Sequence, residues 1–442
     1  MSETVKIVTL GCEKNLVDSE MMSGLIHERG YTLVEHPEEA TVIIVNTCGF
    51  IDMAKEESVN TILDMADLKK TGRLKALIVS GCLTQRYKEQ LMKEMPEIDG
   101  IVGTGDFYNI NEIIDQALAG RKPVLVGNPV FNYEKAMPRL ITTPRYTAYV
   151  KIAEGCDNAC TFCSIPMMRG KFRSRSIESI VEEVERLAGQ GVREINLIAQ
   201  DSTNYGRDLY DRFMLPTLLN KVSEVDGIRW VRLHYAYPGF FTDELIETIA
   251  DNPKICKYVD MPLQHSEDHI LKRMRRPGRQ RDARELIEKI RTRIPDVALR
   301  TSIIVGFPGE TEDDFRNLCN FVQEMEFDRL GVFAYSREED TPASRLPDHL
   351  PDEVKEYRAA ALMELQRAIS GKRNERRIGK VLDVLIERYD GRNDVYIGRS
   401  QYDAPEIDGE VFVANCKVGI GEFGKVRITH SFEHDLSGEG IA

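Results

Sequence analysis

The central part of the chain, about residues 145–370, repeats one local pattern, in which a short apolar strand is followed by a helix. Six candidate strands recur roughly every 35 residues, and they lie in AYVKIAEGC, REINLIAQD, RWVRLHYAYP, KYVDMPLQH, LRTSIIVGFPG and RLGVFAYS. Repeated units of this kind predict a β/α barrel, complete or partial. Active sites in such barrels lie at the carboxyl ends of the strands, so we expect functional side chains there.

The first region, residues 1–140, also alternates β-branched runs with helical stretches. Candidate strands lie in VKIVTLGC, TVIIVNTCGF, KALIVSGCL and GIVGTGD, and helices are expected over Val17–Arg29, Met53–Leu68 and Gln85–Met95. The strands are almost continuously apolar, which is typical of parallel strands covered on both faces. A parallel α/β sheet is therefore predicted, followed by a linker over residues 131–147 that contains two prolines.

Three cysteines occupy the same topological position in this first region. Cys12, Cys48 and Cys82 each follow a separate predicted strand. Because ligands of open α/β sheets bind at the carboxyl ends of the strands, the three thiols are expected to share one rim. The alternative is that each is a small buried hydrophobic residue at a strand end.

The last region has a different character from the first two. Short strands in LDVLIERY, DVYIGRS, EVFVANC and GKVRITH are separated by turns rich in Gly and Asp, which predicts a small β-barrel. We therefore expect an α/β multidomain protein with an N-terminal domain over 1–140, a β/α barrel over 141–374 and a small β-barrel over 375–442. A helix over about Asp352–Arg377 should lead out of the central barrel.

Composition narrows the class of protein. The sequence shows neither a signal peptide nor an apolar run long enough to cross a bilayer, so a cytoplasmic location is expected. Thiols stay reduced in that compartment, so the nine cysteines are expected to be ligands or buried thiols, not disulfides. The net charge of −13 favours a basic protein partner over a nucleic acid as the main partner.

The loop EGCDNACTFCSIP carries Cys156, Cys160 and Cys163 within eight residues. Structural zinc sites normally have four protein ligands, and cubane iron–sulfur clusters normally have four cysteines. Three thiolates around one cubane would leave one iron free to bind a substrate or cofactor. A zinc site with a distant fourth ligand is the alternative that the spacing leaves open.

The spacing CDNACTFC, with Phe162 before the last cysteine, resembles the CxxxCxxC motif of the radical S-adenosylmethionine (SAM) enzymes. The whole chain is similar to the methylthiotransferases of that superfamily, whose C-terminal barrel is a TRAM domain (OB-like in form). The resemblance implies two [4Fe-4S] clusters, one held by Cys156, Cys160 and Cys163 and one by Cys12, Cys48 and Cys82. It also implies that SAM is both the methyl donor and the source of the radical.

Two branches of these methylthiotransferases differ in substrate. The MiaB-like branch modifies an adenosine of tRNA, and the RimO-like branch modifies the β-carbon of an aspartate in ribosomal protein twelve of the small subunit. The segment GRSQYDAPEIDGEVFV resembles the RimO type, and residues 374–442 carry four more acidic than basic residues. We therefore expect the ribosomal protein as substrate, with Asp403, Glu406 and Asp408 offered to this basic partner.

Further partners follow only from the resemblance or from charge. An electron donor protein is required, and a monomer is expected because nothing indicates an obligate dimer. The basic segments Leu271–Arg284 and 371–380 could contact ribosomal RNA, or could simply be solvated surface.

Several residues at predicted strand ends are candidates for contact with SAM. Gln200, Gln264 and Gly306 are the candidates, and His265 is expected at the same mouth. For Gly306 the alternative is a simple strand-to-helix turn, in which Gly is common. Cys256, Cys319 and Cys416 lie outside both trios and are assigned no ligand role.

Overall fold

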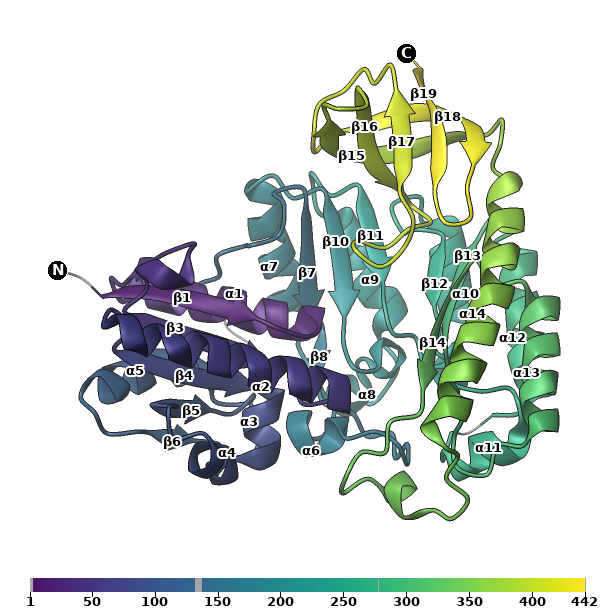
Figure 1. Cartoon of the computed structure of the whole chain (residues 1–442). Helices are drawn as coiled ribbons and strands as arrows, with labels where there is room; N and C mark the ends of the chain where they lie inside the picture. The colour runs from purple at the N-terminus through teal and green to yellow at the C-terminus, as the bar shows by residue number, and fades with distance from the viewer. Residues whose placement is uncertain (1–2, 132–136, 277, 442) are drawn as a thin grey trace.

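The computed structural model describes residues 3–131, 137–276 and 278–441. Figure 1 shows three units along the chain: an α/β unit, a central barrel and a small β-barrel. Among the described residues, no helix has both the length and the apolar character that crossing a membrane would require.

The N-terminal unit is a six-stranded parallel sheet in the order β2-β1-β3-β4-β5-β6. Its strands are β1 (Thr4–Thr9), β2 (Thr32–Leu33), β3 (Val42–Thr47), β4 (Ala76–Gly81), β5 (Gly100–Val102) and β6 (Val124–Leu125). The parallel sheet and four of these strands confirm the prediction. Strands β2 and β6 have only two residues each, which is too short to give a readable pattern in the sequence.

Helices cover both faces of this sheet. Helices α1 (Glu13–Glu28) and α5 (Ile110–Leu118) pack on one face, and α2 (Asp52–Asp67) and α4 (Glu89–Glu94) pack on the other. The single helix predicted over Gln85–Met95 is wrong. It is replaced by α3 (Cys82–Tyr87) and α4, because Lys88 between them has a left-handed φ of 49° that interrupts the helix.

The central barrel has six parallel strands and is only partly closed. They form two sheets of three, ordered β11-β10-β7 and β12-β13-β14, and a single bridge between Val231 and Ile255 joins the two halves. The strands are β7 (Thr147–Lys151), β10 (Glu194–Ile198), β11 (Trp230–Leu233), β12 (Tyr258–Asp260), β13 (Ala298–Val305) and β14 (Arg329–Ala334). Strands β7 and β14 are not paired with each other in the described chain, so the barrel is partial.

An outer layer of helices surrounds these strands, and their apolar faces form one large core. The layer consists of α7 (Ile177–Gly189), α9 (Leu215–Glu224), α10 (Asp243–Asp251), α12 (Gln280–Arg293), α13 (Glu312–Met325) and α14 (Asp352–Glu375). Shorter elements lie near the strand ends, namely β8 (Ala153–Glu154), α6 (Ile165–Arg169), β9 (Arg173–Ser174), α8 (Arg207–Tyr210) and α11 (Asp268–Arg273). Helix α14 leads to the last unit, as expected.

The C-terminal unit is a closed five-stranded barrel in the order β15-β16-β17-β19-β18. Its strands are β15 (Val381–Asp390), β16 (Val395–Ser400), β17 (Val411–Ala414), β18 (Phe423–Ser431) and β19 (Leu436–Ile441). The sequence predicted the barrel but not β19, whose sequence LSGEGI lacks β-branched residues until its end. Glycine is required there, because a Cβ on Gly438 would lie 2.4 Å from the carbonyl oxygen of Arg427.

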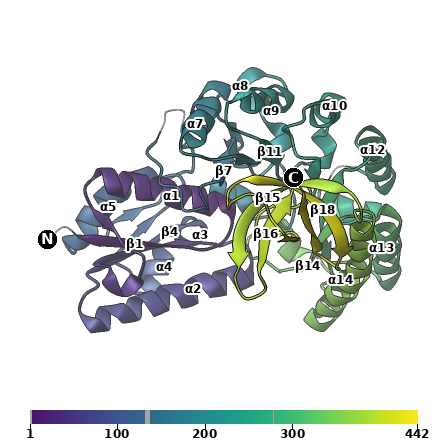
Figure 2. The same ribbon diagram turned by 90° about the horizontal axis from the view of Figure 1, so that it is seen from above.

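The small barrel packs on the amino ends of the central strands: Figure 1 shows it above the central barrel, and Figure 2, seen from above, shows it in front of the central barrel. Arg399 pairs with Glu194 at 2.7 Å, at the first residue of β10. Tyr258, the first residue of β12, donates a hydrogen bond of 2.7 Å to Asp408. The carboxyl ends of the central strands, where the three-cysteine loop lies, are therefore at the opposite end from the small barrel.

This packing corrects the expectation about the acidic side chains of the small barrel. Asp403 is 2% exposed and accepts a bond of 2.6 Å from Arg329, the first residue of β14. The side chain of Asp408 is also buried, between Tyr258 and Arg300. Only Glu406 of the three is exposed, so Asp403 and Asp408 hold the two barrels together and are not offered to a partner.

Candidate active site

The first cysteine trio lies on one rim, as predicted. Cys12 precedes α1, Cys48 follows β3 and Cys82 is the first residue of α3, and the strands before them are neighbours in the sheet. The loops are in direct contact, since a Cβ on Gly11 would lie 3.2 Å from the Cys48 sulfur and one on Gly49 would lie 3.0 Å from the Cys82 backbone. Glycine at both positions therefore allows the three loops to meet.

Asn15, in the first turn of α1, connects these three loops. Its amide nitrogen donates hydrogen bonds to the carbonyl oxygens of Leu10 at 2.9 Å and Thr47 at 3.0 Å. Its amide oxygen lies 3.9 Å from the Cys82 sulfur. One buried side chain thus contacts the loop before Cys12, the strand end before Cys48, and Cys82 itself.

The second trio lies in the loop between β8 and α6, beyond the carboxyl end of β7. The loop is folded on itself, since Cys163 N–H donates to the Cys160 carbonyl at 3.2 Å and Cys156 N–H donates to the Gly170 carbonyl at 3.1 Å. The guanidinium of Arg276 approaches the Cys160 sulfur to 3.8 Å. Hydrogen bonds to cluster sulfurs are one means by which proteins set a cluster potential.

Burial disfavours the charged form of the most enclosed thiols of the two trios. It raises the pKa of Cys82 and of Cys163 to about 12, and the pKa of Cys156 to about 11. Metals bind the thiolate, so metal loading must release protons at both trios. Arg169 partly offsets the effect of burial at Cys82, and Arg276 does so at Cys163. Each trio thus has an arginine nearby that favours the thiolate form.

Neither trio is a compact single-metal site. Zn–S bonds are about 2.3 Å long, so sulfurs that share one zinc lie within about 4.6 Å of each other. Among the described residues, the group of metal-ligating atoms that lies this close together is Glu267, His269 and Asp314, which belongs to neither trio. The arrangement of the described side chains therefore does not favour a zinc ion on either trio.

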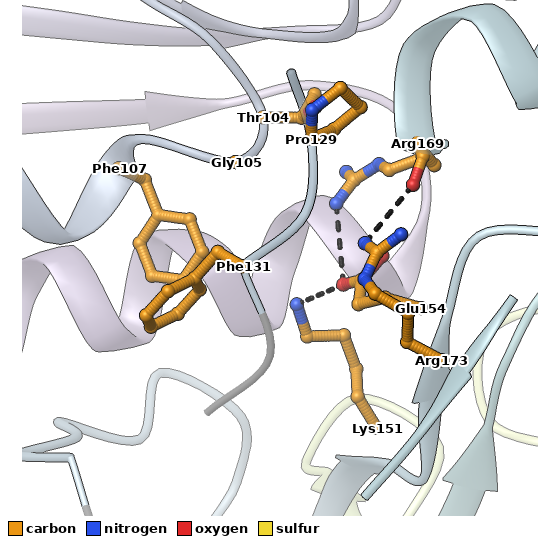
Figure 3. Close-up of a pocket in the computed structure, with 9 residues that line it drawn as sticks. All are labelled: Thr104, Gly105, Phe107, Pro129, Phe131, Lys151, Glu154, Arg169 and Arg173. Atoms are coloured by element: carbon orange, nitrogen blue, oxygen red, sulfur yellow. Dashed lines mark hydrogen bonds and ion pairs between the residues drawn. The ribbon is translucent and has the colours of Figure 1, made fainter. Parts of the chain in front are cut away.

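Buried charges connect the two trios. Arg169, at the end of α6, donates to Asn15 Oδ1 at 2.5 Å and to Asp18 at 2.7 Å, and it lies 3.5 Å from Glu154. Lys151 binds both Asp18 and Glu154. Figure 3 shows Arg169, Glu154 and Lys151 together beside the small pocket that they help to line. Although burial opposes it, Lys151 and Arg169 lower the pKa of Glu154 to about 2, so the network is ionised.

The candidate SAM residues lie at strand ends, with different surroundings. Gln200 donates to Glu154 at 3.4 Å, and its Oε1 is buried without a partner among the described residues. Gln264 has a left-handed φ of 73°, and its backbone pairs with β13. The N–H of Gly306 donates to Glu310, and a Cβ there would lie 2.4 Å from Lys355, which agrees with a packing role for the glycine. Their SAM contacts remain predictions.

His265 follows β12, on the side of the strand's carboxyl end, and is engaged by the protein itself. Its imidazole is buried and lies 3.2 Å from Glu310, which also binds Arg358 at 2.6 Å. The Glu310 carboxylate is therefore the partner of the His265 imidazole within the protein. Cys256 is buried, and Cys319 and Cys416 are partly buried, away from both trios.

Sequence reasoning missed the residues that join the trios. Asn15 lies three positions after Cys12, and Arg169 lies six positions after Cys163, within MMRGK. Their nearness to the cysteines was the available signal, but a single Asn or Arg has no spacing that predicts such contacts. Arg276 entered the sequence analysis only as part of the basic segment Leu271–Arg284.

Comparison with known proteins agrees with this three-part organisation. The chain matches an uncharacterised protein family, UPF0004, over residues 4–103, the radical SAM superfamily over 150–322, and a TRAM domain over 378–441. Two ribosomal protein uS12 methylthiotransferases named RimO are each 51% identical to it. The protein from Desulforamulus reducens covers 99% of both chains, and the one from Clostridioides difficile covers 98% of both.

The chain belongs to the RimO family. RimO relatives are methylthiotransferases of the radical SAM superfamily, so SAM and a [4Fe-4S] cluster are implied for this chain as well. The Cys156, Cys160 and Cys163 loop carries the motif of that superfamily.

Two solved structures share the fold of this chain at low sequence identity. The radical S-adenosylmethionine methyltransferase TsrM from Kitasatospora setae aligns with a TM-score of 0.59 at 14% identity, covering 78% of this chain and 74% of its own. The cobalamin-dependent radical enzyme OxsB aligns with a TM-score of 0.54 at 11% identity, covering 83% and 56%. At this identity the likeness extends to the fold alone.

Proposed function

We propose that this protein adds a methylthio group to the β-carbon of an aspartate in ribosomal protein uS12. Two [4Fe-4S] clusters, one on each cysteine trio, together with SAM would supply the sulfur, the methyl group and the radical. Membership of the RimO family supports the substrate, and the proposed reaction takes place in the cytoplasm, where ribosomes are. An electron donor protein is also required.

The observation that carries this proposal is the buried contact between the segments that carry the two trios. The amide of Asn15 lies against all three loops of the first trio and binds Arg169, which ends the helix that follows the second trio. A substrate carbon held between two such sites could be reached from both. The protein's own residues would hold the clusters, bury them from water and fix the distance between them.

The TRAM barrel contributes to architecture in this proposal. Its buried Asp403 and Asp408 fasten it to the amino ends of the barrel strands, so the mouth stays open for a protein substrate. In this proposal the exposed residues of the basic segment 271–284 contact ribosomal RNA. Arg276 does not take part, because it is engaged at Cys160. We propose that the protein works as a monomer.

Mass spectrometry tests the function directly. The protein is reconstituted anaerobically with iron and sulfide, reduced, and incubated with SAM and purified uS12. The expected result is a mass gain on one aspartate equal to a methylthio group replacing a hydrogen. A gain on a tRNA adenosine, with uS12 unchanged, would instead support the tRNA-modifying activity.

A further inference from the structure

One short segment of the central barrel reaches both cysteine trios. Tyr235 and Tyr237 follow β11 at its carboxyl end. The Tyr235 hydroxyl donates to Glu13, the residue after Cys12, at 3.0 Å. The Tyr237 ring packs against Arg276, with 4.2 Å from the guanidinium carbon to the ring centroid, and Arg276 lies beside Cys160. The segment therefore spans the space between the two sites.

The backbone of Tyr235 is held in an unusual conformation. Its φ of 59° lies in the left-handed region, which bulky residues rarely adopt. Its N–H donates to Asp260 at 3.1 Å, and its carbonyl accepts from the N–H of Ser202 at 3.0 Å. Strained residues that are fixed by their surroundings concentrate at functional sites, because the strain places a side chain where function needs it.

The side chain that Tyr235 supports is Lys14, two positions after Cys12. Its ammonium nitrogen lies 3.3 Å from the Tyr235 ring centroid, and the Lys14 side chain is only 8% exposed. The nearest carboxylate oxygen, on Glu13, is 3.7 Å away, and that carboxylate already accepts from the Tyr235 hydroxyl. Within the described chain, no hydrogen bond from the ammonium is found.

Other buried cations of this protein have closer partners. Lys151 binds Asp18 and Glu154, Arg169 binds Asp18, and Arg399 binds Glu194 at 2.7 Å. A buried ammonium has three donors, and leaving them without acceptors is costly. Lys14 thus keeps donor capacity next to the first trio and beside the segment that reaches the second.

We infer that Lys14, held against Tyr235, binds the side-chain carboxylate of the aspartate that is modified. This inference rests on the proposed function. The carboxylate of an aspartate is bonded directly to its β-carbon, so anchoring the carboxylate fixes the reacting carbon. A carboxylate would supply the acceptors that the ammonium lacks, whereas an adenine base carries no carboxylate. Lys14 is therefore a specificity-determining residue for a protein aspartate.

The test compares two substrates on each enzyme variant. Equilibrium binding to the reconstituted protein is measured for uS12 and for uS12 whose target aspartate is replaced by asparagine. The wild type should prefer the aspartate form, and Lys14→Gln should weaken binding of that form by about 10- to 100-fold. Binding of the asparagine form should stay unchanged, so that the preference disappears. Lys14→Arg should retain part of the preference because it keeps the positive charge.

Controls separate this inference from the proposed function. Lys70→Gln removes a lysine charge from the same domain at a side chain that is 78% exposed, and it should leave the preference intact. The preference is the ratio of the two binding constants, for the aspartate and the asparagine form, measured on the same variant. A loss of iron or of stability therefore does not by itself remove the preference. An equal preference in wild type and Lys14→Gln would overturn the inference while the proposed function stands. A wild-type protein that modifies no uS12 would refute the proposed function itself, and the inference with it.

Discussion

Arg169 donates a hydrogen bond of 2.5 Å to the side-chain oxygen of Asn15, and this bond joins the two cysteine sites. Both side chains are buried, with Asn15 1% and Arg169 3% exposed. Asn15 is bound to the loops of the first trio, and Arg169 closes the helix after the second. Their contact therefore gives the two sites a fixed separation through only two residues.

Replacing Asn15 should empty the first site selectively. Asn15→Ala removes the part-buried bond to Leu10 and the buried bond to Thr47, and loss of a buried bond costs about 1–3 kcal/mol. We expect the reconstituted protein to lose about four irons while it still cleaves SAM reductively. Iron analysis and 5′-deoxyadenosine release measure both effects. Asn111→Ala removes a single bond to Leu25 in the same domain and is the matched control; full iron in Asn15→Ala would refute this role.

Removing Arg276 should make the radical SAM cluster harder to reduce. Its guanidinium lies 3.8 Å from the Cys160 sulfur, and a positive charge there stabilises the more negative, reduced cluster. Arg276→Gln should lower the midpoint potential by roughly 40–90 mV, which corresponds to about 1–2 kcal/mol for one electron. Redox titration followed by electron paramagnetic resonance measures the shift. Arg281→Gln, on an exposed side chain of the same basic segment, should leave the potential unchanged.

Asp403 should matter for stability, and Glu406 should not. Asp403→Asn leaves the buried guanidinium of Arg329 without its charged partner, which costs about 3–5 kcal/mol. The expected result is an earlier denaturant midpoint and faster proteolysis between the central barrel and the TRAM barrel. Glu406→Gln changes an exposed residue of the same loop and should behave like wild type. Equal stability of the two variants would contradict the assigned role of Asp403.

Docking of the TRAM barrel should weaken in acid. Burial alone would raise the pKa of Glu194, but Arg399 and Arg232 outweigh it and lower the pKa from 4.5 to about 2. A depressed carboxyl pKa stabilises the fold above the unfolded value, and this stability is lost as pH falls from about 5 towards 2. The loss is about 3 kcal/mol. Unfolding measured against pH should show this decline in wild type and a flatter curve in Glu194→Gln.

A surface carboxylate supplies the control for this pH dependence. Glu247 pairs with Arg293 on exposed side chains, so Glu247→Gln should retain the wild-type decline. If Glu194→Gln lost stability in acid as steeply as wild type, another group would be responsible for the decline.

Strand and helix periodicity was enough to predict the three units, because buried parallel strands and amphipathic helices leave regular patterns. Elements without such patterns were missed. Strands β2 and β6 have two residues each, and β19 owes its path to Gly438, which admits the Arg427 carbonyl. The convergence of Cys12, Cys48 and Cys82 was predictable because strand ends of a parallel sheet share an edge.

Contacts between distant segments were not predictable in this way. The acidic loop of the TRAM barrel was interpreted by its charge, but the burial of Asp403 depends on Arg329, which lies 74 residues earlier in the chain. The pairing of Lys14 with Tyr235 likewise depends on how the first domain packs on the barrel. Such tertiary contacts decide whether a charge is structural or available to a ligand.

The most direct test of the account is the iron and sulfide content of three proteins reconstituted in parallel. Wild type should hold about eight irons. Each of two triple variants should hold about four. One variant replaces Cys12, Cys48 and Cys82 by alanine, and the other replaces Cys156, Cys160 and Cys163 by alanine. Mössbauer spectra should assign the iron of every sample to [4Fe-4S] clusters. About four irons in wild type, or about eight in the Cys12, Cys48 and Cys82 variant, would contradict two clusters on two cysteine trios.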